Sequence, residues 1–190
     1  MGIALSATCG FKVFVPVLCI SICSKAGFIS LTPSFMWLGS YPAIFLLSVA
    51  TILEICAYYI PYIDNLLDTI SIPAAAIAGI IVVSSTMVAD ISPMLKWTLA
   101  IIAGGGAGAA IKTTSAALRS TSAIITGGTC NNIVNTLETG SAFIGSLLAI
   151  LTPILGSILV VCLIVLTFIL VRRLYRSFKN KAKTSQIPAA

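Results

Sequence analysis

Apolar runs long enough to cross a lipid bilayer recur along this sequence and constrain its fold more than any other feature. A helix needs about twenty predominantly apolar residues to cross a hydrocarbon layer of about 30 Å. Charges and prolines separate candidate spans at about residues 3–24, 41–60, 72–89 and 94–111. A last run, at about 141–171, contains Pro153 and is either one tilted, kinked helix or a broken one. The sequence therefore predicts about five spans.

The composition excludes an ordinary soluble fold. Apolar residues make up 58% of the 190 residues and charged residues only 8%, against about 25% charged in a typical soluble domain. The mean hydropathy is +1.11. Because the first charge, Lys12, lies inside the first apolar run, we expect a retained span there rather than a removable signal peptide. We predict an all-α, polytopic transmembrane bundle formed by residues 1–171, followed by a basic tail at 172–190.

Two segments are too polar to be lipid-facing spans. The stretch PYIDNLLDTIS places Asp64 and Asp68 four residues apart on one helical face and apolar side chains on another, which predicts a short helix lying in the membrane interface. The stretch from Lys112 to Gly140 is rich in hydroxyl groups and small residues. Because such a segment at membrane depth must be surrounded by protein or by a water-filled cavity, we predict that it is re-entrant.

The basic tail determines the expected orientation. Its sequence, RRLYRSFKNKAK, is cytoplasmic by the positive-inside rule, so we expect a protein of the bacterial inner (cytoplasmic) membrane with its C-terminus inside. With five spans, Lys25 and Lys96 also fall inside, while Asp64, Asp68 and the N-terminus fall outside. We interpret the tail as a topology anchor, so that the lipid bilayer is the expected partner and nucleic acid is not.

Seven charges lie away from the tail and the basic connections: Lys12, Glu54, Asp64, Asp68, Lys112, Arg119 and Glu138. A lone charge at mid-bilayer costs about 2.5–3.5 kcal/mol, so such residues are expected in pairs or in a cavity. A rise of about 1.5 Å per helical residue places Lys12 and Glu54 at similar depths. The sequence therefore predicts a contact between these two side chains.

These charges have two interpretations. They can be internal ion pairs that fix helix register, or they can form a substrate or ion pathway. Lys112 and Arg119 lie two helical turns apart, with Ser115 and Ser120 nearby, and such a basic, hydroxyl-rich face suits an anionic or strongly polar solute. We expect Lys112 and Arg119 to point into a water-accessible cavity together with Glu138.

The glycine-rich stretch AGGGAGAAIKTT resembles the start of a phosphate-binding loop. It lacks the glycine that such a loop needs before its lysine, because Ile111 stands there. Small residues four apart predict a helix-packing face instead, formed by Ala103 and Ala107 and by Gly104 and Gly108. The chain has no histidine, and its six cysteines form no C-x-x-C pair, so neither a metal site nor a cofactor is expected.

A weak internal echo divides the sequence. A lysine, then Leu-Glu, proline, glycine and an apolar run occur in this order from Lys12 to Val83, and again from Lys112 to Val161. Two halves of this plan, with three spans in the first, suggest an inverted repeat like that of many secondary transporters. The spacings differ between the halves, so coincidence stays open as an explanation.

Several longer motifs stand out: GFKVFVPVL, then LEICAYYIPYIDNLLD followed by IPAAAIAG, then GGGAGAAIKTTSAALRS followed by GGTCNNIVNTLE. Together they resemble the bacterial membrane-protein family catalogued as domain of unknown function 4126, over about residues 2–161. The resemblance implies a polytopic membrane protein with no established activity. An acidic residue of the family pattern is replaced here by Tyr58 or Tyr59, and another by Thr139, which argues against a family-wide ion role at those positions.

We predict a small transporter or channel-like protein for a polar or anionic solute, and not an enzyme. About five spans enclose little cavity alone, so we expect a homo-oligomer. The alternative is a structural or assembly subunit whose charges hold partner helices. A lipid-acting enzyme with Lys112 and Ser115 as a Ser-Lys pair is a further alternative, disfavoured by the lack of histidine and of a metal set.

Overall fold

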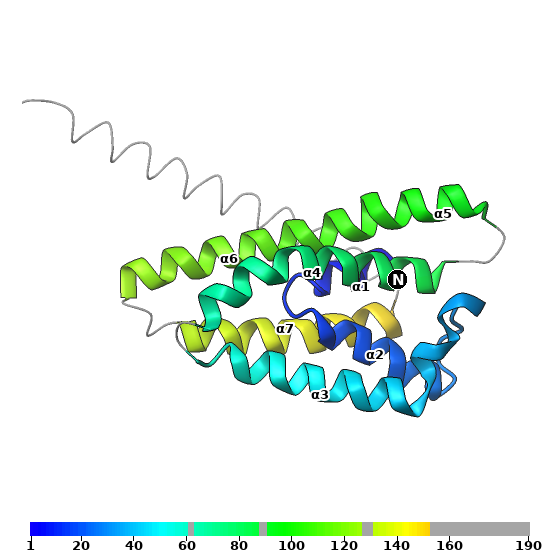
Figure 1. Ribbon diagram of the computed structural model, residues 1–190, viewed down its shortest axis with the longest axis horizontal. Helices are drawn as coiled ribbons and strands as arrows, with labels where there is room; N and C mark the ends of the chain where they lie inside the picture. Colours follow the sequence, from blue (N-terminus) through cyan, green and yellow to red (C-terminus); the bar gives the residue numbers. More distant parts are fainter. Residues whose placement is uncertain (61–62, 88–90, 127–130, 153–190) are drawn as a thin grey trace, which may run out of the picture.

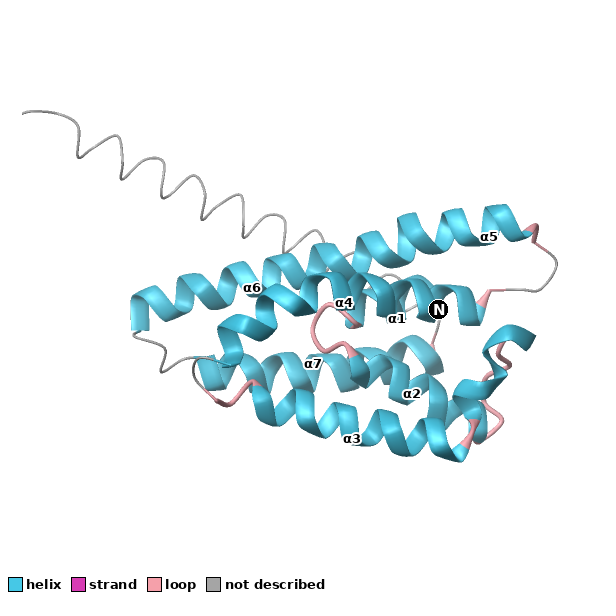
Figure 2. Ribbon diagram, in the orientation of Figure 1, coloured by secondary structure: helices cyan, strands magenta, loops and turns pink. Residues whose placement is uncertain are grey.

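The computed structural model describes residues 1–60, 63–87, 91–126 and 131–152, and these residues form helices without strands (Figures 1 and 2). The α-helices are α1 (Gly2–Thr8), α2 (Phe14–Lys25), α3 (Tyr41–Ala57), α4 (Ile63–Thr86), α5 (Pro93–Leu99), α6 (Gly106–Thr126) and α7 (Asn131–Leu151). A 3₁₀ helix, η1 (Pro33–Gly39), precedes α3, and a π-helical segment, η2 (Ala100–Gly105), joins α5 to α6. The predicted all-α fold is confirmed over this part of the chain.

Local sequence explains several helix boundaries. The hydroxyl of Ser40 accepts a hydrogen bond from the first turn of α3, and the hydroxyl of Ser92 does the same for α5. Gly27 has a φ of 81° just after α2. The amide of Gly27 donates to the carbonyl of Ser24 and the amide of Phe28 donates to that of Cys23, which together close α2 with a Schellman motif.

The N-terminal apolar run folds back on itself instead of crossing the bundle. Figure 1 shows α1 running inward from the N-terminus and α2 returning beside α3. Along α1, Gly2 lies against Val83 and Ser6 lies against Gly79, so α1 is antiparallel to α4. The loop at residues 9–13 therefore lies inside the bundle, at the tip of a helical hairpin.

The second arm of this hairpin packs against α3. The amide of Val13 donates to the carboxylate of Glu54 at 2.7 Å, and the hydroxyl of Ser21 donates to the carbonyl of Leu38 just before α3. Helix α2 is therefore antiparallel to α3. The prediction of a single first span at 3–24 is wrong, and the predicted separation of the N-terminus from Lys25 is wrong with it.

The directions of these helices determine which segments lie at each end of the bundle. The Lys25 end holds Met1, the Lys25–Tyr41 connection, the end of α4 and the start of α5, and the amide of Thr32 donates there to the carbonyl of Ser85 at 3.0 Å. The opposite end, called the Asp64 end, holds the starts of α4 and α7. There the amide of the Asn131 side chain donates to Asp64 at 2.9 Å.

Three helical stretches are long and apolar enough to cross a membrane: Leu66–Thr86, Pro93–Thr121 and Asn131–Leu151. A fourth results if η1 and α3, which are bent by 66°, count as one span. A multi-pass membrane protein is therefore supported by these described helices. The predicted number of about five spans is not confirmed by them.

Both predicted polar segments are parts of longer helices. The expected interfacial helix around Asp64 and Asp68 is the first part of α4, which continues through Pro73. The described residues of the expected re-entrant stretch from Lys112 to Gly140 belong to α6 and to the first half of α7. These two predictions are wrong because the polar faces of α4, α6 and α7 turn toward one another inside the bundle. The element that enters the bundle and turns back is the apolar α1–α2 hairpin.

Two further predictions concern the second half of the chain. Within the predicted run 141–171, residues up to Leu151 belong to α7, whereas 153–171 and the tail at 172–190 lie outside the described residues. The suggested inverted repeat pairs the segments that lead to Lys12 and to Lys112. These segments run in the same direction, because Ser6 lies beside Gly108 and Gly10 beside Ile111, so this pairing is not an inversion.

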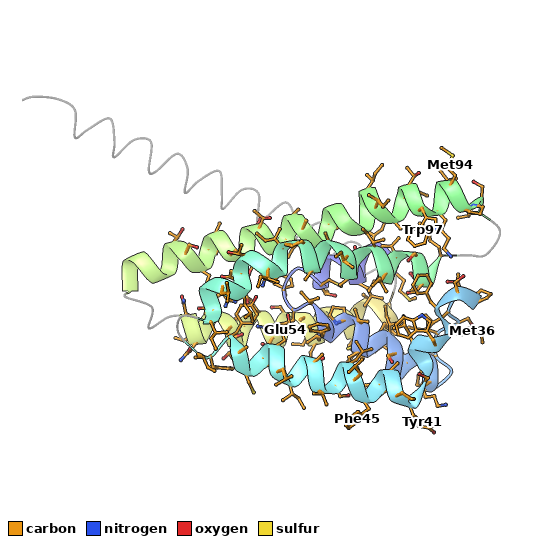
Figure 3. All side chains as sticks on the ribbon, in the orientation of Figure 1. Met36, Tyr41, Phe45, Glu54, Met94 and Trp97 are labelled. Atoms are coloured by element: carbon orange, nitrogen blue, oxygen red, sulfur yellow. The ribbon has the colours of Figure 1, made fainter. Side chains whose placement is uncertain are left out.

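Helix α1 forms the centre of the fold, and the apolar side chains on the outer helices face outward. Every residue from Ala4 to Gly10 is buried, and α1 packs against α4, α6 and α7. On the outside, Phe45 of α3 is 73% exposed and Met94 of α5 is 84% exposed (Figure 3). Outward-facing apolar side chains around a small-residue core are typical of a protein solvated by lipid.

Glycines permit the close contact between α4 and the η2–α6 rod. A Cβ atom on Gly79 would meet the backbone carbonyl of Gly104, and a Cβ atom on Gly104 would meet that of Gly79. Gly108 is equally close to the backbone of Ala75. The predicted packing face is therefore confirmed at Gly104 and Gly108, and it lets the backbones approach without side chains between them.

We expect Gly104→Ala to lower the free energy of unfolding in detergent by roughly 1–3 kcal/mol, because its methyl group must displace the backbone of α4. Gly106→Ala is the matched control, since no atom lies within 4 Å of its Cβ position. Denaturant titration followed by circular dichroism measures both variants. Equal stabilities of the two variants would contradict the close packing of Gly79 on Gly104.

The hairpin also predicts a topology. In a background with the six native cysteines replaced, we expect thiols introduced at Ser30 and Met94 to react with an impermeant reagent from the same side of the membrane. A thiol at Ile60, near the Asp64 end, should react from the other side, and a tag before Met1 should be accessible on the Ser30 side. Accessibility of that tag on the Ile60 side would mean that α1 and α2 cross the membrane as one span.

Candidate functional site

Seven of the nine charged residues in the described part of the chain gather in the half of the bundle nearer the Asp64 end; the other two are Lys25 and Lys96. We call this group the charge cluster: Lys12, Glu54, Asp64, Asp68, Lys112, Arg119 and Glu138. Asp68 is half-buried and the other six are buried. They come from the hairpin tip, α3, α4, α6 and α7, so all seven residues predicted from the sequence are brought together. Figure 3 shows Glu54 on the inner side of α3.

Arg119 of α6 lies among three carboxylates of the cluster. One terminal nitrogen donates to Asp64 at 2.7 Å, and the other donates to Glu138 of α7. Its Nε lies 3.7 Å from the carboxylate of Asp68. Ser115, one turn earlier on α6, donates its hydroxyl to the second oxygen of Glu138. One guanidinium thus joins α6 to α4 and to α7, which fits the planar, multidentate donor geometry of arginine.

Tyr58, at the end of α3, lies at the centre of the basic contacts. Its ring centroid lies 3.6 Å from Nζ of Lys12, 4.4 Å from the guanidinium carbon of Arg119 and 4.7 Å from Nζ of Lys112. The phenol oxygen accepts from Lys112 at 2.7 Å and donates to Ser71 at 3.0 Å. One tyrosine therefore contacts three cations, and its ring and its hydroxyl stabilise them.

Sequence reasoning did not include Tyr58 among the site residues. Its only signal was indirect: Tyr58 or Tyr59 stands where the resembled family pattern has an acidic residue. Asn135 of α7 was missed as well, although it is fully buried and bonded to Lys12. A neutral aromatic or amide residue gives no charge signal, so only the fold reveals these partners.

Lys12 and Glu54 do not form the predicted ion pair. Nζ of Lys12 donates to the side-chain oxygen of Asn135 at 2.6 Å. The carboxylate of Glu54 accepts instead from the backbone amides of Val13, at 2.7 Å, and Phe14, at 3.1 Å. These amides begin α2 and have no partner within their own helix, so the carboxylate caps a helix N-terminus and complements its dipole. The two residues reach the same depth, as predicted, but their side chains bond in different directions.

Lys112 and Arg119 are enclosed by the other described residues. Lys112 is 0% exposed and Arg119 is 1% exposed. A cavity of about 130 Å³ borders the cluster at Ser115 and Glu138, and another of about 460 Å³ borders it at Glu54 and Tyr58, but neither basic side chain lines either of them. The expected water-accessible face around Lys112 and Arg119 is not found among the described residues, where carboxylates and the Tyr58 ring cover both side chains.

The enzyme and metal alternatives find no matching geometry within the described residues. Ser115 donates to Glu138 while Lys112 donates to Tyr58, so these two side chains do not form a Ser-Lys pair. Over the same part of the chain, no group of three or more aspartate, glutamate, histidine or cysteine side chains is arranged to hold a metal ion. The chemistry that the described site offers is charge pairing and hydrogen bonding.

Replacing Arg119 by glutamine should lower the free energy of unfolding in detergent by about 3–5 kcal/mol, because Asp64 and Glu138 would stay buried without their cation. Lys96→Gln, which removes a cation outside the charge cluster, should change it by less than about 0.5 kcal/mol. Equal effects of the two substitutions, measured by thermal or denaturant unfolding, would refute the central role of Arg119.

Residues 1–173 match the protein family described as Domain of unknown function (DUF4126). No curated protein and no solved structure matches the chain.

Proposed function

The chain belongs to the family of domains of unknown function DUF4126, and we propose that it works as a small membrane transporter for a polar or anionic solute. The observation that carries this proposal is the α1–α2 hairpin, whose tip ends inside the bundle against the charge cluster. Broken helices that meet buried charges inside the membrane are the usual solute and ion sites of secondary transporters. In this proposal the hairpin is the moving element and the cluster is the polar site.

The number of buried charges supports a role beyond holding the helices together. Well-packed apolar residues often replace a buried ion pair with no loss of stability. If the charges only had to hold α4, α6 and α7 together, apolar packing could replace them. Close contacts between small residues already join α4 to η2 and to α6. A cluster of seven charges is costly in lipid and is expected where charge or protons move.

The start of α2 supports an anionic solute. The amides of Val13 and Phe14 point their N–H groups at a carboxylate, which in this structure is that of Glu54. The cavity of about 460 Å³ lies directly beside Glu54 and is lined mainly by apolar side chains. If the hairpin moves away from α3, the same amides, together with Lys12, offer a place for the acidic group of a small organic anion.

The remaining features of the proposal are those expected from the sequence. The protein lies in a bacterial inner membrane, has no enzymatic activity and works as a homo-oligomer. The outward apolar residues of α3, among them Phe45 and Leu46, are available to lipid or to a second copy. The cavities beside the cluster, about 130 and 460 Å³, are small for a complete pathway, which is consistent with an assembly of several copies.

A second candidate function is a structural or assembly subunit of a larger membrane complex. The enclosure of Lys112 and Arg119 favours it, since both cations are satisfied internally and reach no cavity among those that border the cluster. In this case the cluster would fix the register of the helices and the outer apolar faces would carry the interaction. The two candidates make opposite predictions for Glu54.

The test is binding and uptake of labelled small carboxylates and phosphate by purified protein in proteoliposomes. If the amides of α2 hold the solute anion, Glu54→Gln removes a competing charge and should tighten binding by about tenfold, equivalent to 1.4 kcal/mol. Lys12→Gln removes the cation at the hairpin tip and should weaken binding by a similar factor.

Lys96→Gln serves as the control with unchanged uptake, because Lys96 lies on α5 outside the charge cluster. Loss of assembly in both cluster variants, with no binding by the wild type, would support the structural subunit instead. Binding that falls in both variants would place the solute away from the start of α2.

A further inference from the structure

The charge cluster is not electrically balanced. Its basic members are three, Lys12, Lys112 and Arg119, and its acidic members are four: Glu54, Asp64, Asp68 and Glu138. An uncompensated charge away from water is unstable, since its solvation is lost without a full counter-charge. One added positive charge would make the cluster neutral.

We propose that the charge cluster binds one proton, and that Asp68 is the carboxylate that carries it. Only one part of this inference rests on the proposed transport function, namely the role of the proton as the ion whose movement drives transport. Binding of the proton itself is a property of the buried cluster and does not depend on any solute.

The hydrogen bonds of the four carboxylates single out Asp68. Glu54 receives two backbone amides, Asp64 receives Arg119 and Asn131, and Glu138 receives Arg119 and Ser115. The carboxylate oxygen Oδ1 of Asp68 is buried and has no hydrogen-bond partner. When ionised, Asp68 therefore keeps one buried oxygen without a donor, whereas both oxygens of each of the other three carboxylates receive one.

The cations nearest to Asp68 lie too far away for hydrogen bonds. Nζ of Lys112 is 3.7 Å from Oδ1, and Nε of Arg119 is 3.7 Å from Oδ2. Arg119 is only 1% exposed, and its buried Nε has no hydrogen-bond partner among the described residues. The unpaired acceptor, Oδ1, thus lies opposite Lys112, and the unpaired donor, Nε, lies opposite Oδ2, each across a gap. A proton can be added at Oδ1 without breaking a hydrogen bond.

A proton also suits the surroundings of Asp68 better than a metal cation does. The groups that face it from the packed helices are Lys112 and Arg119 on α6, Asp64 on its own helix, Glu138 on α7 and Tyr58 at the end of α3. The two basic side chains would repel a metal ion placed between them and Asp68. A proton forms a covalent O–H bond on the carboxylate itself and needs no additional space.

Asp68 is the member of this acidic group that solvent reaches best. Its side chain is 13% exposed, against 6% for Asp64 and for Glu138. It lies in the early part of α4, near the Asp64 end of the bundle. A proton can therefore arrive from the aqueous side at that end.

Protonation of Asp68 would reach the hairpin through one chain of contacts. It removes the charge that attracts Lys112, whose remaining partner is the phenol of Tyr58. The ring of the same tyrosine holds Lys12 at the hairpin tip. A proton on Asp68 therefore changes the charge balance around the residue that anchors the element proposed to move.

Infrared difference spectroscopy of the full chain in proteoliposomes tests this proposal, because a protonated carboxyl group absorbs apart from carboxylates. We expect one carboxylic acid band that is present at about pH 4 and is lost in a single titration step by about pH 9. Asp68→Asn should abolish it, and Asp68→Glu should restore it at a shifted frequency. Lys96→Gln is the matched control and should keep the band unchanged.

Three results would overturn the proposal: no titrating band in the wild type, a band that persists in Asp68→Asn, or loss of the band when sodium replaces choline at constant pH, which would indicate a metal cation at the site. Solute uptake is measured on the same liposomes. Uptake without a proton band would reject proton binding by Asp68 and would leave the transport function intact. A proton band without any solute binding would support proton binding by Asp68 and reject the transport function.

Discussion

The guanidinium of Arg119 is the contact on which the polar half of the bundle depends. Among the described residues, it is the one side chain that bonds to both Asp64 of α4 and Glu138 of α7, and its guanidinium carbon lies 4.4 Å from the ring centroid of Tyr58 at the end of α3. In lipid these three helices have no hydrophobic driving force toward one another, so such polar contacts carry much of their specificity. Neutral side chains complete the site around this centre: Ser115 donates to Glu138, Asn131 donates to Asp64, and the ring of Tyr58 lies beside Lys112 and Lys12.

The composition and the charges were sufficient to predict the fold class and the seven charged residues of the cluster, but not Tyr58 or Asn135. An apolar chain with a few isolated charges can be soluble in lipid only as helices, and those charges are stable there only if they meet. The seven residues chosen on this ground do come together. Their pairing was not predictable, because depth along a helix places two residues at one level without showing which way each side chain turns. Lys12 and Glu54 illustrate this limit.

The helical elements were predicted wrongly where an apolar sequence could face either the protein core or lipid. Helix α1 is apolar because it is the core, enclosed by α4, α6 and α7, whereas the equally apolar α3 exposes Phe45 and Ile52 to the outside. Sequence hydropathy does not distinguish a residue buried in protein from one that faces lipid. The polar stretches gave the reverse error: they were judged unable to span the membrane, yet α6 and α7 can do so because each buries its polar residues against the other and against α4.

The hairpin is held differently at its two ends, and this difference determines how it could move. Toward the Lys25 end, α1 lies in a groove of small residues, with Gly2 against Val83 and Ser6 against Gly79, and such close backbone contacts leave little room for displacement. At the tip, the contacts are hydrogen bonds from Lys12 to Asn135 and from the start of α2 to Glu54. Polar contacts of this kind can be exchanged for others of similar energy, with water, a solute or a proton, whereas packed backbones cannot. Motion is therefore expected to begin at the tip, where α2 can separate from α3, while α1 stays fixed against α4.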